Sequence, residues 1–511
     1  MINKCVTEFV EDALKHASDN YRQPASPLLA DAYNKETKQH LRRDYGKKLE
    51  CADVVFSNLA RQMNFMRVLN ALYVLEGNEN YQKVFVDNYN YYIENYQHEN
   101  GLFAWGGHRM IDLKTLETTG EMTHELKNDY PAYSLMLSIN REKTLKYIEA
   151  FWNAHVYKWE TLETSRHGDY EKKMGRLWDN EFADPEPFIE VTGLSFANTG
   201  SDLIYAACEY YKATGEEKAL LWAKRLEHMY YKSRDKETGL GVYQFNQTKA
   251  RKFSDDFSIT TSDYGDRAKR QMGPELGETC LEGNLLLDSK TKTIYCFSTL
   301  VLLHEARTLS TFGGFAAELA KTFLDHCREG LESFAKHAYI PETNKFRPLL
   351  ANGHDLTNFE LQRDGYYGKK GNIFKQYSAE GTYFLVFSKT AAMTGSDILW
   401  QTAKQIGQAL GLGCIGEKNG AEPSLNYEST SDCHFCLFAF LNLYLITKND
   451  KYLNMADIIV KNISTKYRTF INSKSNQQEY ISINNILALA ITCYEATKLG
   501  KLNEIDASIY I

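Results

Sequence analysis

The sequence predicts an all-α fold, an α/α toroid of helical hairpins with long loop insertions and minor β structure. Three observations predict it: prolines are rare, apolar residues recur at helical spacing in paired segments, and long polar loops separate these pairs. The 511 residues contain only 9 prolines, and proline is the residue that most strongly interrupts helices. Because single helical toroids reach this length, we expect residues 1–511 to form a single domain.

Residues 201–232 show the hairpin pattern most clearly. Apolar residues at helical spacing form two stripes, which are Ile204, Ala207, Cys208 and Tyr211 in the first and Ala219, Trp222, Leu226, Met229 and Tyr230 in the second. Between the stripes, Gly215 suits the C-terminus of one helix and Glu217 suits the first turn of the next. The segment therefore predicts two antiparallel helices.

Breaks of the same kind precede further apolar stripes at residues 76–79, 138–141, 394–397 and 447–450. Their spacing is irregular, which argues against a strict solenoid repeat and for hairpins with insertions. Long polar and aromatic loops separate the pairs at roughly 100–130, 160–200, 235–285, 340–375 and 411–435. Loops of this length in a compact domain are usually functional. A generic all-helical protein is the alternative to the toroid.

Composition restricts the class of protein. With 43% hydrophobic and 24% charged residues, the profile is that of a globular chain. The net charge of −7 argues against a general nucleic-acid binder, and no run of 18 apolar residues predicts a membrane span. The N-terminal residues are acidic where a signal peptide would be basic, and ten thinly spread cysteines suggest reduced thiols. We therefore expect a cytoplasmic protein, with its oligomeric state left open.

Three loop segments contain candidate metal ligands. His108 follows two glycines in the string WGGHR, Glu125 lies in THELKNDYPAY, and His167 follows Arg166 in TSRHGDY. Two imidazoles and a carboxylate can hold a divalent metal with open positions. However, the three residues lie far apart in the chain, so their spacing alone is not a specific metal motif. A polar surface role for each histidine stays open.

Cationic residues in two other loops are candidates for binding an anionic ligand. The most basic loop contains Arg267 and Arg270, which could clamp carboxylates through bidentate pairing. Arg363 stands near Tyr366 and Tyr367, which combines a cation with aromatic rings on which sugars stack. A run of mixed charge is also typical of a solvated face.

Two further patterns allow other functions. Cys433 and Cys436 have the spacing of half a zinc or redox motif, but the chain has no second such pair, so packing in a helix is the favoured interpretation. A hydrolase could use carboxylates of one acidic loop as acid and base. Those residues are Asp179, Glu181, Asp184, Glu186 and Glu190. Surface acidity is the favoured account of most of them.

Several of these loop strings resemble polysaccharide lyase family 2, the pectate lyases with an α/α barrel fold. The matching strings are WGGHR at 105, HELKNDYPAY at 124, IEAFWNAHV at 148, SRHGDY at 165, GDRAKRQMGPELG with LEGN between 265 and 284, and RDGYYG at 363. The helical stretches are not diagnostic. The loop strings taken together are fairly specific, and they extend the resemblance over most of the chain.

The resemblance implies that His108, Glu125 and His167 hold a transition metal and that Arg166 is the Brønsted base. Glu121, one helical turn before Glu125, stays an alternative ligand. Histidine and carboxylate ligands suit manganese, our first expectation, or cobalt, nickel or zinc better than calcium. Arginine normally keeps its proton, with a pKa above about 12. Arg166 as a cation that pairs with the substrate, with a lysine as base, is therefore also open.

The function that the resemblance implies is β-elimination on polygalacturonate. Because an enzyme inside the cell meets only short imported oligomers, we expect an exolytic lyase that releases unsaturated disaccharide from oligogalacturonides. The alternatives are a glycoside hydrolase or sugar epimerase on the same kind of toroid, and a non-catalytic carbohydrate-binding scaffold.

Overall fold

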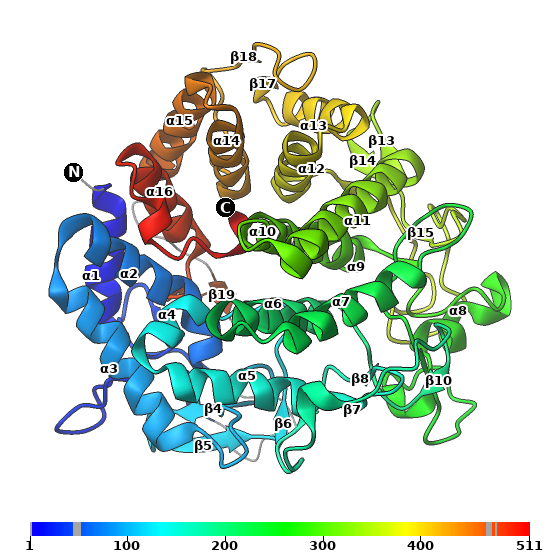
Figure 1. Cartoon of the computed structure of the whole chain (residues 1–511), viewed down its shortest axis with the longest axis horizontal. Coiled ribbons are helices and arrows are strands. Elements are labelled where there is room, and N and C mark those ends of the chain that lie inside the picture. Colours follow the sequence, from blue (N-terminus) through cyan, green and yellow to red (C-terminus); the bar gives the residue numbers. More distant parts are fainter. Residues whose placement is uncertain (1–2, 44–52, 467–472, 476–477) are drawn as a thin grey trace.

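Helices dominate the structure, a computed structural model that describes residues 3–43, 53–466, 473–475 and 478–511 (Figure 1). The helices are α1 (Lys4–His16), α2 (Met63–Glu76), α3 (Glu79–Tyr96), α4 (Tyr133–Ile139), α5 (Arg141–His155), α6 (Ala197–Thr214), α7 (Glu217–Lys232), α8 (Arg267–Leu276), α9 (Asp288–Thr291), α10 (Thr299–Leu309), α11 (Gly314–Ala338), α12 (Gly381–Thr394), α13 (Asp397–Ala409), α14 (His434–Thr447), α15 (Asp450–Lys466) and α16 (Ile486–Lys498).

Most helices pair as hairpins that close into a ring. Consecutive pairs pack as α2 with α3, α4 with α5, α6 with α7, α10 with α11, α12 with α13 and α14 with α15. Around the centre, α4 packs on α6, α6 on the π-helical segment Lys292–Ser298, and that segment on α12. The ring continues from α12 to α14, α16 and α2, and α3 connects α2 to α4. This closed arrangement confirms the predicted α/α toroid.

Apolar patterning separates the inner helices from the outer ones. Every residue of α12 from Gly381 to Ala391 is buried, and so is every residue of α14 from Cys436 to Leu443. A helix that is apolar all round is typically enclosed by other helices. The outer helices α7 and α13 bury only one stripe, in which Trp222 and Trp400 are fully buried. The largest apolar cluster includes residues from Val6 to Ile511.

The short hairpin turns form where the sequence predicts them. Gly77, Gly215 and Gly395 each adopt the left-handed conformation directly after α2, α6 and α12. This conformation is strained for residues with a side chain, so glycine ends a helix there at little cost. The predicted stripes in α6 and α7 face the core. No helix in the described part of the chain is both long and apolar enough to span a membrane.

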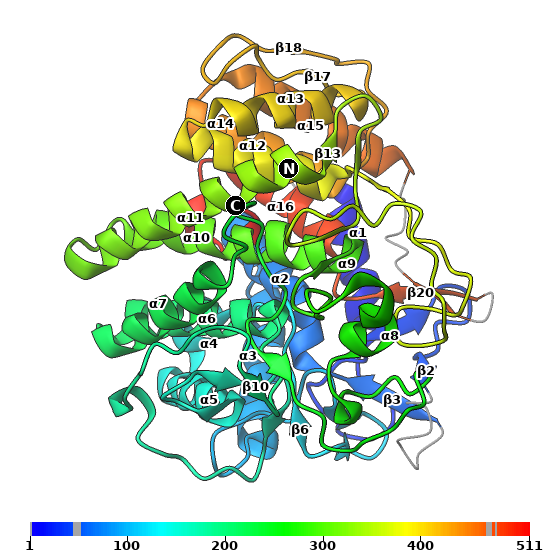
Figure 2. The same ribbon diagram turned by 90° about the vertical axis from the view of Figure 1, so that its right-hand side faces the viewer.

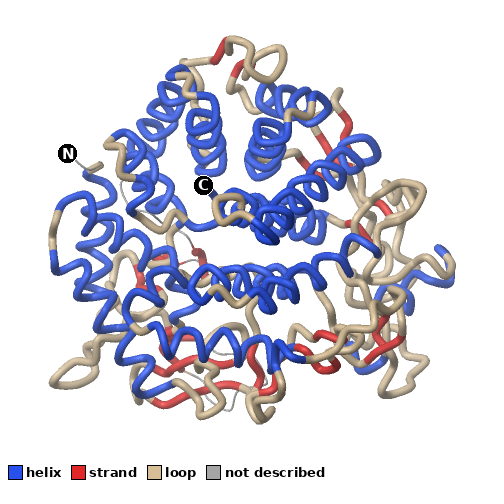
Figure 3. Tube along the Cα trace, in the orientation of Figure 1, coloured by secondary structure: helices blue, strands red, loops and turns tan. Residues whose placement is uncertain are grey.

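Most of the longer connections lie on one face of the ring, on the right in Figure 2. Part of the connection between α5 and α6 instead reaches the start of α7, where Asp179 pairs with Lys218. Figure 3 shows the short strands among these connections. The strands are β1 (Ala32–Asn34), β2 (Arg42–Arg43), β3 (Val54–Ser57), β4 (Arg109–Asp112), β5 (Glu117–Gly120), β6 (Thr123–His124), β7 (Val156–Lys158), β8 (Glu163–Thr164), β9 (Gly168–Asp169), β10 (Glu190–Val191), β11 (Gln247–Thr248), β12 (Leu285–Leu286), β13 (Tyr339–Ile340), β14 (Lys345–Phe346), β15 (Leu349–Leu350), β16 (Tyr377–Ser378), β17 (Gly413–Cys414), β18 (Ser424–Leu425), β19 (Ser473–Ser475) and β20 (Gln478–Ser482). They confirm the predicted minor β structure.

One predicted loop contains a helix. Residues 235–285 were expected to be loop, but α8 forms within them. Asp266 caps this helix by accepting a hydrogen bond of 2.8 Å from the backbone N–H of Lys269. The buried Arg267 at its first position then pairs with Glu282 further along the chain. This long-range ion pair stabilises α8, and the sequence pattern of the loop does not reveal it.

A buried ion pair joins α2 to the C-terminal segment. Arg67 Nε lies 3.0 Å from Asp506 Oδ1, and the side chains of both residues are almost completely buried. Arg67 also donates a hydrogen bond of 2.8 Å to the backbone oxygen of Tyr130. Because each charge has its counter-charge, neither is left uncompensated in the protein interior.

We predict that Arg67→Met lowers the free energy of unfolding by about 3–5 kcal/mol, because it leaves Asp506 buried without its partner. Urea denaturation followed by circular dichroism measures the change. The matched control is Lys83→Met, which removes an exposed pair with Asp87 within α3. Its expected effect is close to zero. Equal effects of the two substitutions would contradict the structural role of the buried pair.

Candidate active site

Backbone pairing brings the three predicted metal ligands together on the loop face. Strands β6 and β9 pair antiparallel with His124 opposite Gly168, so the adjacent residues Glu125 and His167 leave the pair side by side. A parallel bridge between Gly106 and Glu125 brings the segment before β4 alongside them. His108 therefore reaches the same point from a third segment.

The three side chains form a compact cluster. Their nearest ligand atoms all lie within 4.8 Å of one another. His108 Nε2 lies 3.5 Å from Glu125 Oε2, and His167 Nε2 lies 3.7 Å from Glu125 Oε1. The two imidazole rings are nearly perpendicular, at 87°, with their centroids 4.9 Å apart. Residues that are distant in sequence thus present two nitrogens and a carboxylate to one point.

The two glycines before His108 make room for Glu125. Gly106 has φ of +96°, and a Cβ there would lie 2.1 Å from the backbone oxygen of Glu125. A Cβ on Gly107 would lie only 1.9 Å from Glu125 Oε2. The positive φ is therefore one reason for glycine at position 106. Close approach of the carboxylate is the reason at Gly107.

Glu125 is a buried carboxylate surrounded by cations, with an exposed fraction of 1%. Lys127 Nζ lies 3.0 Å from its Oε2 and Arg166 Nε lies 3.5 Å from its Oε1. Burial would raise the pKa of Glu125, but the positive charges of Lys127 and Arg166 hold it below its ordinary value. Oε1 is buried and accepts no hydrogen bond from the described residues. The carboxylate is therefore ionised and has an oxygen available to a further cation.

Each imidazole presents its Nε2 to the carboxylate of Glu125. Burial, together with the charge of Arg166, lowers the pKa of His167 to about 3, so its ring is neutral. Arg166 Nε donates a hydrogen bond of 3.1 Å to His167 Nε2, which marks that nitrogen as an acceptor. His108 Nδ1 lies 3.0 Å from Glu121 Oε2. The other ring nitrogen of His108, Nε2, faces Glu125.

This geometry separates the two glutamates that the sequence left as alternatives. Glu125 lies between both histidines and Arg166, whereas Glu121 contacts the outer nitrogen of His108. Glu121 follows β5 and lies opposite His108 because β4 and β5 pair with Arg109 facing Gly120. A divalent transition metal fits the donor set of two imidazole nitrogens and one carboxylate. Glu121 is placed to orient one of those imidazoles.

A second group of acidic and histidine side chains has a different character. Glu209, His304 and Glu305 also bring ligand atoms within 4.8 Å of one another. However, Lys212 Nζ lies 3.2 Å from Glu305 and also pairs with Glu209. The ammonium group already supplies the compensating positive charge. We therefore interpret this second group as a buried ion-pair network.

Arg166 and two of the predicted substrate-binding residues share one wall of the site. The guanidinium carbons of Arg166 and Arg267 lie 5.3 and 5.8 Å from the centre of the Phe196 ring. Arg267 also stacks on Tyr366 at 3.8 Å. The Phe196 ring packs against Tyr243, with centroids 4.8 Å apart. The structure thus places Arg267 and Tyr366 near Arg166, and it pairs Arg267 with Glu282 as well.

Lys290, which the sequence analysis did not single out, belongs to the same wall. Its Nζ lies 4.9 Å from the centre of the Tyr243 ring and donates hydrogen bonds of 2.9 Å to the Glu282 backbone oxygen and the Tyr367 hydroxyl. Burial lowers the pKa of Lys290 to about 8, against the opposing charge of Glu282. Its position at this wall makes Lys290 a candidate for the base that the sequence left unidentified. No local sequence signal marks it, because it lies in an ordinary polar helix start.

Arg270 and Arg363 turn to other partners. Arg270 donates to the backbone oxygen of Ile259 and lies over the Tyr264 ring. Arg363 forms two hydrogen bonds with the Glu275 carboxylate, one of them 2.8 Å long. The sequence grouped Arg270 with Arg267 in one basic loop, and it singled out Arg363 for its neighbours Tyr366 and Tyr367. The structure brings only Arg267 to the wall that contains Arg166.

Comparison with known proteins identifies the family of this chain. Residues 26–510 match the family model described as periplasmic pectate lyase. The chain belongs to this family. A pectate disaccharide-lyase from Dickeya dadantii (strain 3937) is 34% identical over 396 residues, which cover 73% of this chain and 69% of that protein. The predicted resemblance is confirmed, and the chain is a polysaccharide lyase of the pectate lyase family.

Solved structures give weaker likenesses. The cellobiose 2-epimerase from Bacillus thermoamylovorans B4167 aligns over 97% of this chain and all of its own, with 10% identity and a TM-score of 0.41. A D-mannose isomerase aligns over 97% of both chains, with 11% identity and a TM-score of 0.45. An unsaturated glucuronyl hydrolase specific for heparin aligns over 99% of this chain and 98% of its own, with 9% identity and a TM-score of 0.41. Scores this low support no inference about activity.

The acidic loop of this pectate lyase family member lies in surface ion pairs. Asp179 pairs with Lys218, and Asp184 pairs with Lys232, which also contacts Glu186. The side chains of Asp179, Asp184 and Glu186 are more than half exposed. Exposed pairs of this kind do not create the contrasting environments that a hydrolase needs for its acid and its base.

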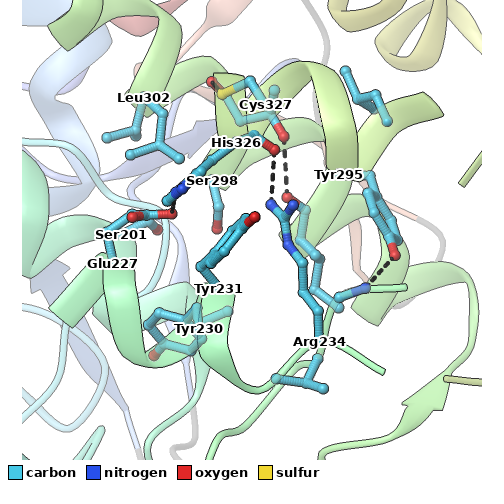
Figure 4. A pocket seen from close by; sticks show the side chains of 18 of the residues that line it. Ser201, Glu227, Tyr230, Tyr231, Arg234, Tyr295, Ser298, Leu302, His326 and Cys327 are labelled. Atoms are coloured by element: carbon cyan, nitrogen blue, oxygen red, sulfur yellow. Dashed lines mark hydrogen bonds and ion pairs between the residues drawn. The ribbon is translucent and has the colours of Figure 1, made fainter. Parts of the chain in front are cut away.

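A separate cavity lies between the α6–α7 and α10–α11 hairpins of the lyase (Figure 4). Its walls are mostly apolar, with one buried pair in which His326 Nδ1 lies 2.8 Å from Glu227 Oε1. Tyr231 stacks on His326, and Arg234 donates to the His326 backbone oxygen at 2.7 Å. The one arginine that lines it is thus already bound. A polyanionic chain needs several available cations, so we do not assign the substrate to this cavity.

We predict that Gly107→Ala weakens metal binding by about 10- to 100-fold, because the added methyl group displaces Glu125 from both histidines. Titration with Mn²⁺ followed by calorimetry measures the affinity, and circular dichroism checks that the lyase stays folded. Gly175→Ala is the matched control, since that glycine is exposed and its added Cβ would meet nothing closer than 3.5 Å. If both variants bound Mn²⁺ like the wild type, the proposed ligand role of Glu125 would be wrong.

Proposed function

We propose that this family member is a metal-dependent pectate lyase that cleaves α-1,4-galacturonate linkages by β-elimination, acts exolytically on short oligogalacturonides and releases unsaturated disaccharide. The observation that carries the proposal is the cluster of Glu125 with His108 and His167 beside Arg166. The family match and the name of the Dickeya relative support the substrate class. The exolytic mode, the metal and the cytoplasmic location predicted from the sequence stay predictions.

Elimination from a uronate removes the proton at C5 and expels the oxygen at C4. That proton is only weakly acidic while the neighbouring carboxylate carries its full charge. A divalent metal held by His108, Glu125 and His167, manganese by preference and otherwise cobalt, nickel or zinc, would neutralise this carboxylate and stabilise the charge that develops beside it. The carboxylate of Glu125 and one ring nitrogen from each histidine provide the donors for such an ion.

Arg166 is the proposed base that takes the C5 proton. Its Nε lies 3.5 Å from Glu125 Oε1 and 3.1 Å from His167 Nε2, so a uronate bound at the cluster would lie within reach of its guanidine. Arginine is an unusual base because it normally keeps its proton. Lys290 is the alternative base that the structure offers, although it is buried among Tyr243, Tyr367 and Glu282.

The aromatic and cationic wall is proposed to position the rest of the chain. Tyr366 is about half exposed and stacks on Arg267, so its other surface is available to a sugar ring. Arg267 is held by Glu282, which fixes its orientation toward the site. A neighbouring galacturonate would gain both stacking and charge compensation there.

Removal of metal is expected to abolish the reaction. We predict that a chelator suppresses the ultraviolet absorbance gained when the enzyme digests trigalacturonate, and that Mn²⁺ restores it more effectively than Ca²⁺. This absorbance reports the C4–C5 double bond, which hydrolysis does not create. Full activity after complete chelation would refute the metal requirement.

Product sizes from a long polymer test the exolytic mode. Disaccharide as the sole product supports this mode, and a mixture of product sizes contradicts it.

Substitution of Arg166 separates its two candidate roles. We predict that Arg166→Lys, which keeps a positive charge, still lowers kcat by about 10²- to 10⁴-fold, because lysine cannot present a base at the same position. The bound metal, measured by atomic emission, should stay at the wild-type level. Arg141→Lys is the control, since Arg141 donates to the backbone oxygen of Ala213 at the end of α6. An Arg166→Lys enzyme with nearly full kcat would show that Arg166 acts only as a cation.

A further inference from the structure

Cys433 and Cys436 form a close pair of thiols in the described part of the chain. Cys433 is the residue directly before α14, and Cys436 lies in the first turn of that helix. Both side chains line the same surface hollow. Both sulfurs also face Gly381 at the start of α12, where a Cβ would lie 2.4 Å from Cys433 Sγ and 3.0 Å from Cys436 Sγ. The absence of a side chain at Gly381 thus gives both sulfurs their space.

The two thiols differ in access. Cys433 is partly exposed, whereas Cys436 is 1% exposed. Both line a surface hollow of about 520 Å³ together with Glu380, Leu410 and Ser431. A small molecule in this hollow meets Cys433 first. Thiol–disulfide exchange requires this asymmetry, with one accessible sulfur that attacks and a second that resolves the intermediate.

The reactivity of the pair supports the same assignment of roles. The hydrogen bond from Cys436, against the opposing effect of burial, lowers the pKa of Cys433 to about 7. The same interaction, together with burial, raises the pKa of Cys436 well above its ordinary value. Because the thiolate is the nucleophile, Cys433 is the more reactive sulfur near neutral pH.

A metal is the other ligand that paired cysteines can take. Structural zinc sites use four ligands from cysteine and histidine. Among the described residues, the two groups of three or more metal-ligating side chains lie elsewhere, at Glu125 and at Glu305 with their neighbours. The geometry of Cys433 and Cys436 therefore favours a dithiol.

We propose that Cys433 and Cys436 form a thiol–disulfide exchange site that reacts with small disulfides such as oxidised glutathione. The Cys433 thiolate attacks one glutathione sulfur, the S–S bond breaks, and one glutathione leaves and takes up a proton. Cys436 then loses its proton and attacks Cys433 Sγ, which breaks the mixed disulfide and releases the second glutathione as a thiol. Two cysteine thiols are oxidised to one internal disulfide, and one glutathione disulfide is reduced to two thiols.

The test treats fully reduced, full-length protein with oxidised glutathione, alkylates the remaining thiols and analyses the peptides by mass spectrometry. We expect the peptide that contains both cysteines to lose two hydrogen atoms. Cys433 should react about tenfold faster at neutral pH than Cys414, the control. Cys414 is also partly exposed, and its sulfur lies near Glu417. The measurement uses no lyase activity, so its failure and that of the proposed function are independent.

Two variants assign the roles of the sulfurs. C436S should trap a glutathionyl group on Cys433, and C433S should gain none on the buried Cys436. A wild-type protein in which Cys433 reacts no faster than Cys414 would overturn the proposal, and so would a C436S variant without an adduct. Zinc retained by the reduced protein at one equivalent, with both thiols protected from alkylation, would identify a metal site instead. The wild-type measurement decides the question even if a serine variant fails to fold.

Discussion

A carboxylate removed from water is the constraint on which the site depends. An ionised side chain buried at the level of Glu125 is costly unless nearby cations and donors compensate for its lost hydration. Lys127 and Arg166 supply that compensation from different segments, and Gly107 lets the backbone approach the carboxylate closely. The pairing of β6 with β9 fixes which residues meet there. The ion pair between Glu125 and Arg166 therefore helps to hold their two loops together.

The toroid explains why these loops can meet at all. Short turns such as the one at Gly215 connect each inner helix to its outer partner, and long segments lead from outer helices to the next inner ones. Because the paired helices are antiparallel, most of the long segments lie on one face of the ring (Figure 2). Phe196, directly before α6, shows the result: the start of an inner helix contributes a ring to the wall beside Arg166.

The sequence predicted those parts of the structure that depend on local pattern. Helical periodicity predicted the hairpins, and glycine marked their turns, because both act within a few residues. The loop strings led to His108 and His167 through resemblance to a family. Strand register was needed to distinguish Glu125 from Glu121 as the residue between the two histidines. Lys290 was recognised only from its position beside Tyr243 in the folded chain. Arg270 shows the converse, since its proximity to Arg267 in the sequence did not bring it to the same wall of the site.

The cluster and the wall come from different parts of the chain. His108, Glu125 and His167 belong to one continuous third of the sequence, whereas Arg267, Lys290 and Tyr366 come from later insertions between other helix pairs. Natural variation can therefore lengthen, shorten or exchange the later insertions while the helical ring and the earlier loops keep their register. Such a scaffold can diversify in the polymers it accepts without having to evolve its bond-breaking chemistry anew.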